Sequence, residues 1–426
     1  MKSRKIRIAA PMAAFALLIP LAACSDSAEG SDGGSDDGIL RVAMGSPGEA
    51  QIRVWDEAAA EFEEEHGVKV EMNYQEPNLY ETIGLPNLLN GRNAPDVYFE
   101  WAGSRIETRK KDGFVVDLTS AVEDGPIAGL FDDDVFDAVT IDGEIVLIPQ
   151  AEDVTNVLWY NTDIFDDHGI TPPEDWDGLL AICEQLHEAD IIPISSGNKD
   201  LWAAGNWLGH VTSRVVGEEL YDSALAEETD FNTSEWISAF ERVKELADHN
   251  CVNTNINAID DTEGAQLFFQ GKAAMHAIGS WIVSWAIDEA PGLNFDYFNL
   301  PAMPGEGNQE SVIGVITGHT VNAKSSAASQ ELGIKFLALI NSDKYVDKFI
   351  EAELTPMTKH ASEAQDLDSR SADMVELLET APAIVLPPDT GYDLEVAEAF
   401  YQGLAEVIGG QSTPEEAVEE IQRKIN

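Results

Sequence analysis

Hydrophobic residues recur along the chain with two different periods, which alternate from the start of the folded region. Residues 39–44 form a short apolar run and residues 68–72 alternate between apolar and polar, so both segments predict β-strands. Between them, residues 52–62 carry apolar side chains at helical spacing and predict an amphipathic α-helix. Another apolar run, residues 96–101, follows the breaker Pro95 and predicts a third strand. This order predicts a βαβ beginning and an α/β fold, in which ligands bind beyond the carboxyl ends of the strands.

The same alternation continues to the C-terminus. Further strands are expected at residues 144–149, 157–161, 191–196, 273–279 and 312–323. Helices are expected at residues 176–189, 234–249, 330–341 and 395–408. A last helix is predicted to begin after Thr413, because Thr413 and Glu416 form a capping box and Pro414 takes the first helical position. Residues 253–264 are interpreted as a polar loop, since they lack the glycine and the final glutamate of a calcium-binding loop.

The first 38 residues differ in composition from the rest of the chain. A basic start and an apolar stretch, residues 8–21, shorter than a membrane-spanning helix needs, predict an export signal over residues 1–23. The signal ends in Leu-Ala-Ala before Cys24 and resembles the lipobox of bacterial lipoproteins, in which the cysteine is acylated before cleavage. An ordinary signal peptide that contains a cysteine is the alternative. Residues 24–38, rich in Gly, Ser and Asp, predict a flexible acidic tether.

Charge and length narrow the range of partners. The 426-residue chain has a formal net charge of −53, which opposes binding to nucleic acid and to anionic lipid. Its acidic residues are spread along the chain and are typical of the solvated surface of salt-adapted proteins. The length fits two lobes, and no second apolar run is long enough to cross a membrane.

Two cysteines remain once Cys24 is assigned to lipid attachment. In an exported protein, Cys183 and Cys251 are candidates for a disulfide bond that closes a long loop. The alternative is a buried free thiol, because Cys183 shares a helical face with Leu179 and Leu186.

The sequence lacks the motifs of several enzyme classes. It has no Walker-type glycine loop, no Gly-x-Ser-x-Gly elbow, no His-Glu-x-x-His and no paired Cys-x-x-Cys. The eight histidines are scattered rather than grouped at metal-ligand spacing. We therefore expect no catalytic residues, no metal and no cofactor.

Three tryptophans lie at the carboxyl end of a predicted strand or on the loop beyond it: Trp101, Trp202 and Trp281. Side chains at this position face the ligand crevice of an α/β sheet, and a flat indole ring is a platform for the C–H face of a sugar. We therefore interpret the three as ligand-binding residues, with core packing as the alternative. Core packing is the favoured interpretation for the tryptophans on helical stripes, Trp55, Trp176 and Trp236.

Several segments, taken in order, resemble the extracellular solute-binding proteins of sugar-import ABC transporters, the group of maltose-binding-protein-like lipoproteins. They are NAPDVYFEWAGSR, LWYNTDIF, QGKAAMHAIGSW, VNAKSS and GGQSTPEEAVEEI. The resemblance covers nearly all of the chain after the signal and implies a two-lobed, hinged fold with the ligand in the cleft between the lobes. The implied division is an N-lobe of residues 39–152 and 301–345 and a C-lobe of residues 153–300 and 346–426.

The resemblance also implies a set of ligand-binding residues. Trp101 and Arg105 match an aromatic residue and a sugar-binding arginine of the N-lobe, and Trp281 matches the C-lobe platform. Glu152 and Asp153 lie at the first crossing between lobes, and which of them reaches the ligand is left open. The other implied ligand-binding residues are Ser46, Glu49, Glu76, Trp202, Asp389 and Tyr392.

One family tryptophan is missing from this set. It aligns with about Ala397, so Asp389 and Tyr392 are expected in its place. The absence favours a di- or oligosaccharide other than a maltodextrin.

The function implied is that of a monomeric, lipid-anchored binding protein on the outer face of the cytoplasmic membrane. It would bind a carbohydrate without catalysis and pass it to a permease with its ATPase. Two alternatives are a polyamine or quaternary amine as ligand, through cation–π contacts and carboxylates, and a surface glycosidase, which needs two placed carboxyl groups. A pocket position for Arg105 would argue against the amine.

Overall fold

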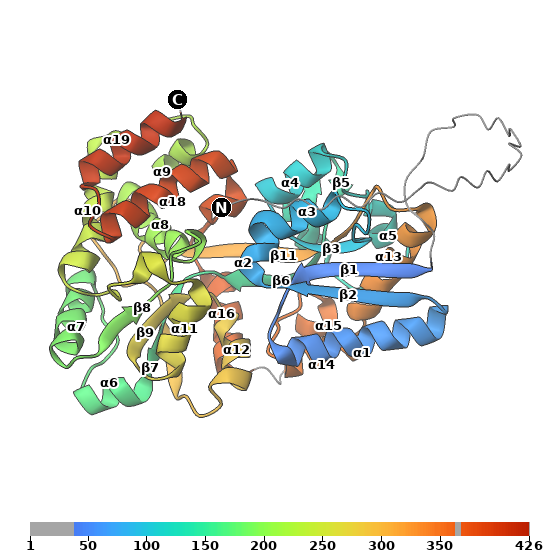
Figure 1. Ribbon diagram of the computed structural model, residues 1–426, viewed down its shortest axis with the longest axis horizontal. Coiled ribbons are helices and arrows are strands. Elements are labelled where there is room, and N and C mark those ends of the chain that lie inside the picture. Colours follow the sequence, from blue (N-terminus) through green and yellow to red (C-terminus); the bar gives the residue numbers. More distant parts are fainter. Residues whose placement is uncertain (1–37, 363–367, 426) are drawn as a thin grey trace, which may run out of the picture. The chain divides into compact units, whose positions relative to one another are not determined.

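The computed structural model describes residues 38–362 and 368–425 (Figure 1). The expected signal over residues 1–23, the lipid-attachment residue Cys24 and nearly all of the tether lie outside the described residues. Among the residues that are described, no helix combines the length and the apolar composition that membrane crossing requires.

The larger of two main sheets has six strands. Its order is β12-β11-β3-β1-β2, with β6 pairing with β11 as well. β1 runs parallel to β2 and β3, whereas β11 is antiparallel to β3 and β6. The strands are β1 (Ile39–Gly45), β2 (Lys69–Gln75), β3 (Val97–Trp101), β6 (Ile148–Val154), β11 (Val312–Val321) and β12 (Ile384–Val385).

Helices pack on this sheet and form one core with it. Trp55 and Phe62 of α1 (Glu49–His66) are buried against Phe336 of α13 (Ala327–Ile340) and Phe349 of α14 (Asp343–Glu351). The shorter elements of this first lobe are α2 (Pro77–Leu79), η1 (Tyr80–Gly84), α3 (Leu85–Leu89), α4 (Ser104–Lys111), α5 (Thr119–Glu123), η2 (Asp133–Val139), α15 (Lys359–Ser362) and the hairpin of β4 (Thr140–Ile141) with β5 (Glu144–Ile145).

The second lobe is built on a four-stranded sheet of order β10-β7-β9-β8. Its strands are β7 (Val157–Asn161), β8 (Ile192–Ser195), β9 (Ala273–Ile278) and β10 (Phe295–Phe298). Its helices are α6 (Thr162–His168), α7 (Trp176–Glu188), α8 (Trp202–Val216), α9 (Glu218–Leu225), α10 (Ser234–Asp248), η3 (Ile256–Ala258), α11 (Asp261–Phe269), α12 (Ile282–Glu289), α18 (Leu394–Ile408) and α19 (Pro414–Ile425). Trp176, Trp236 and Phe400 are fully buried in its core.

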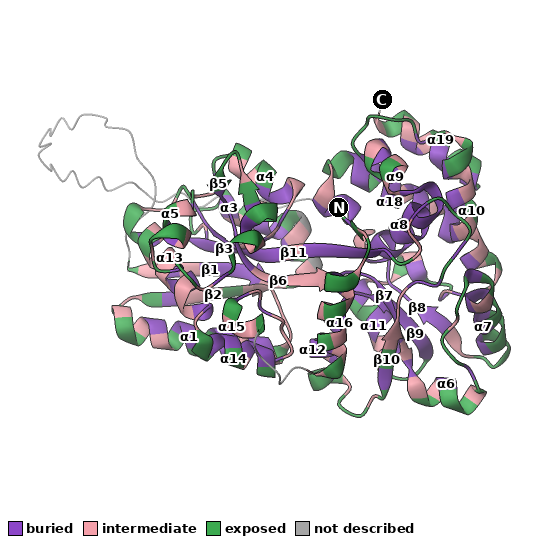
Figure 2. Cartoon of the chain, turned by 180° about the vertical axis from the view of Figure 1, so that it is seen from behind, coloured by how far each residue is buried: buried purple, intermediate pink, exposed green. Residues whose placement is uncertain are grey.

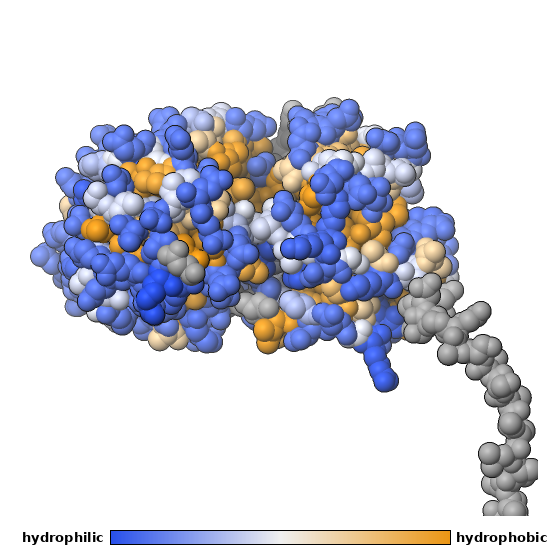
Figure 3. Space-filling view, turned by 90° about the horizontal axis from the view of Figure 1, so that it is seen from above, coloured by the Kyte–Doolittle hydropathy of each residue, from blue (hydrophilic) through white to orange (hydrophobic). Residues whose placement is uncertain are grey.

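Burial follows the same plan in both lobes. The central strands are buried while outer helices expose one face, as Figure 2 shows. Much of the molecular surface in Figure 3 is hydrophilic, with apolar patches between the polar side chains. A largely polar surface over two apolar cores is what the alternating sequence pattern predicts.

Most of the predicted elements are confirmed within a few residues. Thr413 Oγ1 accepts from the amide of Glu416 and Glu416 Oε2 from the amide of Thr413, at 3.2 and 3.1 Å, so the predicted capping box starts α19. The strand predicted at 144–149 is wrong as one unit, because residues 144–145 turn back in the hairpin and β6 begins only at Ile148. The loop predicted at 253–264 is also wrong in its second half, where α11 begins at Asp261.

The chain passes between the sheets several times. β6 in the first sheet is separated from β7 in the second by only Thr155 and Asn156. The boundary expected between residues 345 and 346 falls inside α14, where Tyr345 and Phe349 both pack in the first core. We therefore propose that this lobe boundary lies after α14. Beyond it, α16 (Ser369–Thr380) contacts β6 and β11, and α17 (Pro388–Gly391) contacts α4, α8 and α18.

A disulfide bond joins Cys183 of α7 to Cys251, which follows α10. The two cysteines are 68 positions apart, and both are fully buried in the second core. A cross-link over a loop of this length restricts the unfolded chain more than the folded one.

Removal of this bond is expected to destabilise the protein. In the chain-entropy model, the Cys183→Ala/Cys251→Ala double variant should lose about 4 kcal/mol of unfolding free energy. Denaturant unfolding followed by fluorescence measures the loss. The wild-type protein, denatured without reductant, should show no free thiol from this pair; equal stability of the two proteins would contradict the prediction.

Candidate functional site

A cavity of about 240 Å³ lies between residues of both lobes. The first lobe contributes the loop after β1, the loop after β2 and the ends of β3 and β6. The second lobe contributes the N-terminal ends of α8, α11 and α12. Further lining residues come from α1, η1, β11, α16, α17 and the segment 353–355.

Most of the residues expected to bind ligand line this one cavity. They are Ser46, Glu76, Trp101, Glu152, Asp153, Trp202, Trp281 and Asp389. Arg105, Glu49 and Tyr392 are not among its lining residues. The fold therefore brings together side chains that are up to 343 positions apart in the sequence, from Ser46 to Asp389.

Two tryptophans form an aromatic corner on the second-lobe side. Trp202 is the first residue of α8 and Trp281 is the N-cap residue of α12. Their ring centroids are 6.1 Å apart and the ring planes are inclined by 46°. A Cβ atom at Gly279 would lie 2.1 Å from Cζ3 of Trp281, so only glycine at that position leaves room for this ring orientation.

Trp101, at the end of β3, presents a third ring from the first lobe. Phe99 packs against it edge-on at 4.8 Å between centroids. The guanidinium carbon of Arg105 lies 5.0 Å from the centroid of the Trp101 ring, a cation–π distance. Arg105 is 7% exposed and thus supports the Trp101 ring rather than lining the cavity itself.

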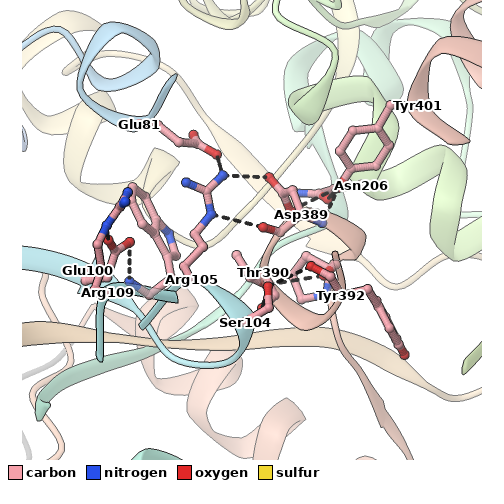
Figure 4. Close-up of polar contacts among 12 residues, drawn as sticks. Glu81, Glu100, Ser104, Arg105, Arg109, Asn206, Asp389, Thr390, Tyr392 and Tyr401 are labelled. Carbon is pink, nitrogen blue, oxygen red and sulfur yellow. Dashed lines mark hydrogen bonds and ion pairs between the residues drawn. The ribbon is translucent and has the colours of Figure 1, made fainter. Parts of the chain in front are cut away.

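Arg105 is the centre of a buried ion cluster (Figure 4). Its Nη2 pairs with Glu81 Oε1 and lies 3.8 Å from Asp389 Oδ2, while its Nε donates to the backbone oxygen of Asp389 at 3.0 Å. Burial raises the pKa of Glu81 above its ordinary value, and the positive charge of Arg105 offsets only part of this rise. The hydroxyl of Tyr401 lies 3.0 Å from Asp389 Oδ1. Since α4 belongs to the first lobe and Tyr401 lies on α18 of the second, this cluster links the two lobes through α17.

The backbone approaches closely at the same place. Gly103 has φ +95°, and a Cβ there would lie 2.3 Å from the backbone oxygen of Thr390. Ser104, next to it, donates through Oγ to the backbone oxygen of Tyr392 at 2.7 Å. Glycine before α4 therefore allows the contact with α17 that the Arg105 cluster needs.

Glu152 and Asp153 both line the cavity. Asp153 Oδ1 accepts from Ser280 Oγ at 2.7 Å, which ties the end of β6 to the segment before Trp281. Burial raises the pKa of Asp153 to about 6, and burial with the neighbouring charge of Asp153 raises that of Glu152. Both carboxyl groups are acceptors for ligand hydroxyl groups.

The remaining two expected residues lie elsewhere. Glu49, in the first turn of α1, is largely exposed and 4.0 Å from Arg53. The hydroxyl of Tyr392 donates to Asp222, and its ring packs edge-on against Tyr221. These contacts direct both side chains away from the lining of the main cavity.

Several lining residues are not predicted from the sequence, including Glu81, Asn206, Asp261 and Trp285. The position of Asp261 at a helix start could have been predicted from the sequence, because Asp260 and Glu263 form a capping box that marks the start of α11. The sequence carries no such signal for Glu81, since it lies in η1, a single π-helical segment.

The lining is rich in aromatic rings and oxygen acceptors. No group of three or more histidine, cysteine, aspartate or glutamate side chains with metal-binding geometry occurs in the part of the chain that is described. Tryptophan rings with carboxylate, amide and hydroxyl groups around them are suited to bind a polar ligand that has apolar faces.

Comparison with known proteins gives one family over most of the chain. Residues 47–347 match the family described as bacterial extracellular solute-binding protein. A Pyrococcus horikoshii protein named as an uncharacterized ABC transporter extracellular-binding protein is 25% identical over 244 residues, which is 56% of this chain and 56% of the relative. The alpha-glucosides-binding periplasmic protein AglE of Rhizobium meliloti is 26% identical over 296 residues, 63% of this chain and 61% of AglE. The chain thus spans about three fifths of the length of these curated relatives.

Solved structures show the same fold over a larger share of the chain. A protein studied in work on xylan utilization by the thermophilic bacterium Caldanaerobius polysaccharolyticus superposes with a TM-score of 0.82 at 23% identity, covering 91% of this chain and all of the other. The predicted two-lobed α/β fold is confirmed.

Replacement of Arg105 is expected to destabilise the protein. Arg105→Gln leaves the carboxylates of Glu81 and Asp389 buried without their guanidinium partner, at a cost of about 3–5 kcal/mol. Thermal and denaturant unfolding measure the change. Arg423→Gln is the control, because its pair with Glu420 is solvent-exposed on α19 and should leave the stability unchanged; equal effects of the two substitutions would contradict the prediction.

Proposed function

The chain belongs to the bacterial extracellular solute-binding proteins, and we propose that it binds a carbohydrate, a di- or oligosaccharide, and delivers it to the permease of an ABC importer. One observation carries the proposal: Trp101 from one lobe and Trp202 with Trp281 from the other line a single cavity. Indole rings stack on the C–H faces of sugar rings, and the carboxylates between them accept from sugar hydroxyl groups. The names of relatives such as AglE support this ligand class.

Binding between lobes supplies the mechanism of the switch. A sugar that contacts Trp101 and the Trp202–Trp281 corner together gains contacts only when the lobes are close. The ligand therefore shifts the hinge equilibrium toward the closed state by its difference in affinity for the two states. The permease can then distinguish loaded from empty protein by the relative position of the lobes.

The protein acts in this proposal as an exported, monomeric receptor anchored by a lipid on Cys24. A tether of residues 24–38 would hold the lobes near the permease and its ATPase. Anchoring keeps the local concentration of the receptor high at the membrane, in the manner of a linked binding module.

No catalysis is part of the proposal. The ligand is released unchanged, and the carboxylates of the cavity act as hydrogen-bond acceptors. Incubation with a bound oligosaccharide, followed by chromatography, should yield no shorter product, whereas a glycosidase would release one.

One observation favours the alternative in which the ligand is a polyamine or quaternary amine. Arg105 does not line the cavity and is neutralised by Glu81 and Asp389, so it does not repel a cation there. The positive charge expected in the pocket is therefore absent from the described lining.

Loss of the Trp281 ring is expected to abolish stacking. Trp281→Ala should weaken carbohydrate binding at least about tenfold without unfolding the protein, because the ring lines the cavity and is part of one edge of the core. Isothermal titration calorimetry measures affinity, and the melting temperature of the free protein verifies the fold.

Two further variants separate ring loss from ring displacement. Trp281→Phe retains a flat ring and should keep part of the affinity. Gly279→Ala retains the tryptophan but forces its ring to move, so it should weaken binding as well. Wild-type affinity in Trp281→Ala would rule this ring out as a sugar platform.

Lipid attachment at Cys24 is expected to decide where the protein is found. In native cells, Cys24→Ala should move the protein from the membrane fraction to the medium or the soluble fraction. Mass spectrometry of the mature wild-type N-terminus should show a diacylglyceryl-modified cysteine. An unmodified Cys24 at an intact signal junction would contradict the anchor and leave the binding proposal unaffected.

A further inference from the structure

The cavity carries an uneven balance of charge. Seven carboxylic side chains line it: Glu76, Glu81, Glu152, Asp153, Asp261, Glu353 and Asp389. No lysine, arginine or histidine lines it among the residues that the structure describes. Arg105 behind the wall supplies one positive charge, shared between Glu81 and Asp389.

The acidic composition of the chain does not account for this balance. Acidic residues of salt-adapted surfaces are solvated, whereas Asp261 and Asp389 are only 4% and 7% exposed. Burial removes the hydration that stabilises a carboxylate, so each of these groups is costly to ionise without a partner. Carboxylates enclosed together also repel one another.

Asp261 is a buried member of this set whose carboxylate makes no hydrogen bond among the described residues. It lines the cavity at the first position of α11, and neither of its carboxylate oxygens has a hydrogen-bond partner among the described residues. Burial raises its pKa to about 7, and the negative charges of Asp260, Asp200 and Glu76 add to the effect. Glu76 belongs to the first lobe, so negative charge faces Asp261 from across the cavity.

The neighbouring basic side chains, His276 and Lys199, neither donate a hydrogen bond to Asp261 nor form an ion pair with it. His276 Nε2 lies 4.0 Å from Asp261 Oδ1, which is too far for a hydrogen bond. The Nδ1 atom of His276 lies 2.8 Å from the backbone oxygen of Ser195 and so carries the proton, which leaves a lone pair on Nε2. Burial lowers the pKa of His276 to about 4, so the ring is neutral at pH 7. Lys199 pairs with Asp260 instead, at 3.9 Å.

We propose that the bound carbohydrate carries a protonated amino group, which Asp261 and Glu76 recognise from opposite lobes. This inference rests on the proposed carbohydrate function and specifies its ligand class as amino sugars. The Trp202–Trp281 corner suits both parts of such a ligand, because indole faces attract C–H groups and cations alike. In the closed state without a ligand, the carboxylates of Asp261 and Glu76 repel each other. A cation bound between them attracts both carboxylates and so stabilises the closed state.

The test uses sugars that differ only in the substituent on carbon 2. Calorimetry at pH 7.5 compares three β-1,4-linked dimers with a hydroxyl, an N-acetyl or a free amino group: cellobiose, diacetylchitobiose and fully deacetylated chitobiose. Glucose with glucosamine and galactose with galactosamine extend the comparison to monosaccharides. Spermidine is the amine control without a sugar ring.

The amino sugars should bind at least about tenfold more tightly than their hydroxyl counterparts. Their affinity should fall as salt is raised from about 0.1 to about 1 M, because charge pairing is screened, while that of a neutral sugar should not. Asp261→Asn should reduce the preference for the amine at least about fivefold. Asp260→Asn is the matched control, since asparagine retains the cap of α11 and the residue does not line the cavity. Its preference should stay close to that of the wild type.

The possible failures are distinguishable. Equal or tighter binding of the neutral sugars overturns the amino-sugar inference and leaves the carbohydrate function standing. Binding of spermidine without binding of any sugar overturns the carbohydrate function itself. An unchanged amine preference in Asp261→Asn, with an unchanged melting temperature of the free variant, overturns the role of Asp261.

Discussion

The contact between α4 and α17, with Arg105 at its centre, is the constraint on which the site depends. One guanidinium group packs over the ring of Trp101, pairs with Glu81 and Asp389, and donates to the backbone of α17. The aromatic platform of the first lobe and a carboxylate of the second-lobe side are thus held by the same side chain. Gly103 makes the approach possible, because a larger residue there would collide with Thr390. Arg105, which the sequence suggested as a ligand-binding residue, does not line the cavity in this structure and holds the cavity wall in place.

The charge of the cavity follows from this arrangement. Arg105 forms ion pairs with two carboxylates behind the cavity wall. The lining itself therefore presents carboxyl groups and aromatic rings without a basic side chain among the described residues. In the part of the chain that the structure describes, this lining combines neutral donors and acceptors with seven carboxyl groups and no positively charged side chain, so it discriminates among polar ligands by their charge. Hydroxyl groups of a ligand can donate hydrogen bonds to the carboxyl groups of the lining. An ammonium group can donate hydrogen bonds and also pair with their negative charge.

The sequence predicts the framework of this fold better than the details of its site. Local signals are strong where one segment decides its own structure, as in the capping box of Thr413 and the alternation that gives β2. They fail where tertiary contacts decide: residues 144–149 divide between a hairpin and β6, and Glu81 lies in a π-helical segment that no spacing rule predicts. The tryptophans at strand ends were found because a parallel sheet places strand ends at one edge. Which side of Trp101 faces the cavity and which faces Arg105 depends on the contact between Arg105 and Asp389, 284 positions further along the chain, and no local pattern contains this contact.

The short connection between β6 and β7 has a consequence for the order in which contacts are lost. Only Thr155 and Asn156 separate strands that belong to different sheets, so the lobe rotation proposed above would turn close to this point. Displacement on rotation grows with distance from the axis, so Asp153, which lies close to the connection and accepts a hydrogen bond from Ser280, would move little. Under the proposed function, ligand contacts far from this connection would break early during opening, and a ligand contact with Asp153 would be kept longest. Departure of the solute would follow a peeling path, in which a single carboxylate near the axis governs the last step of release.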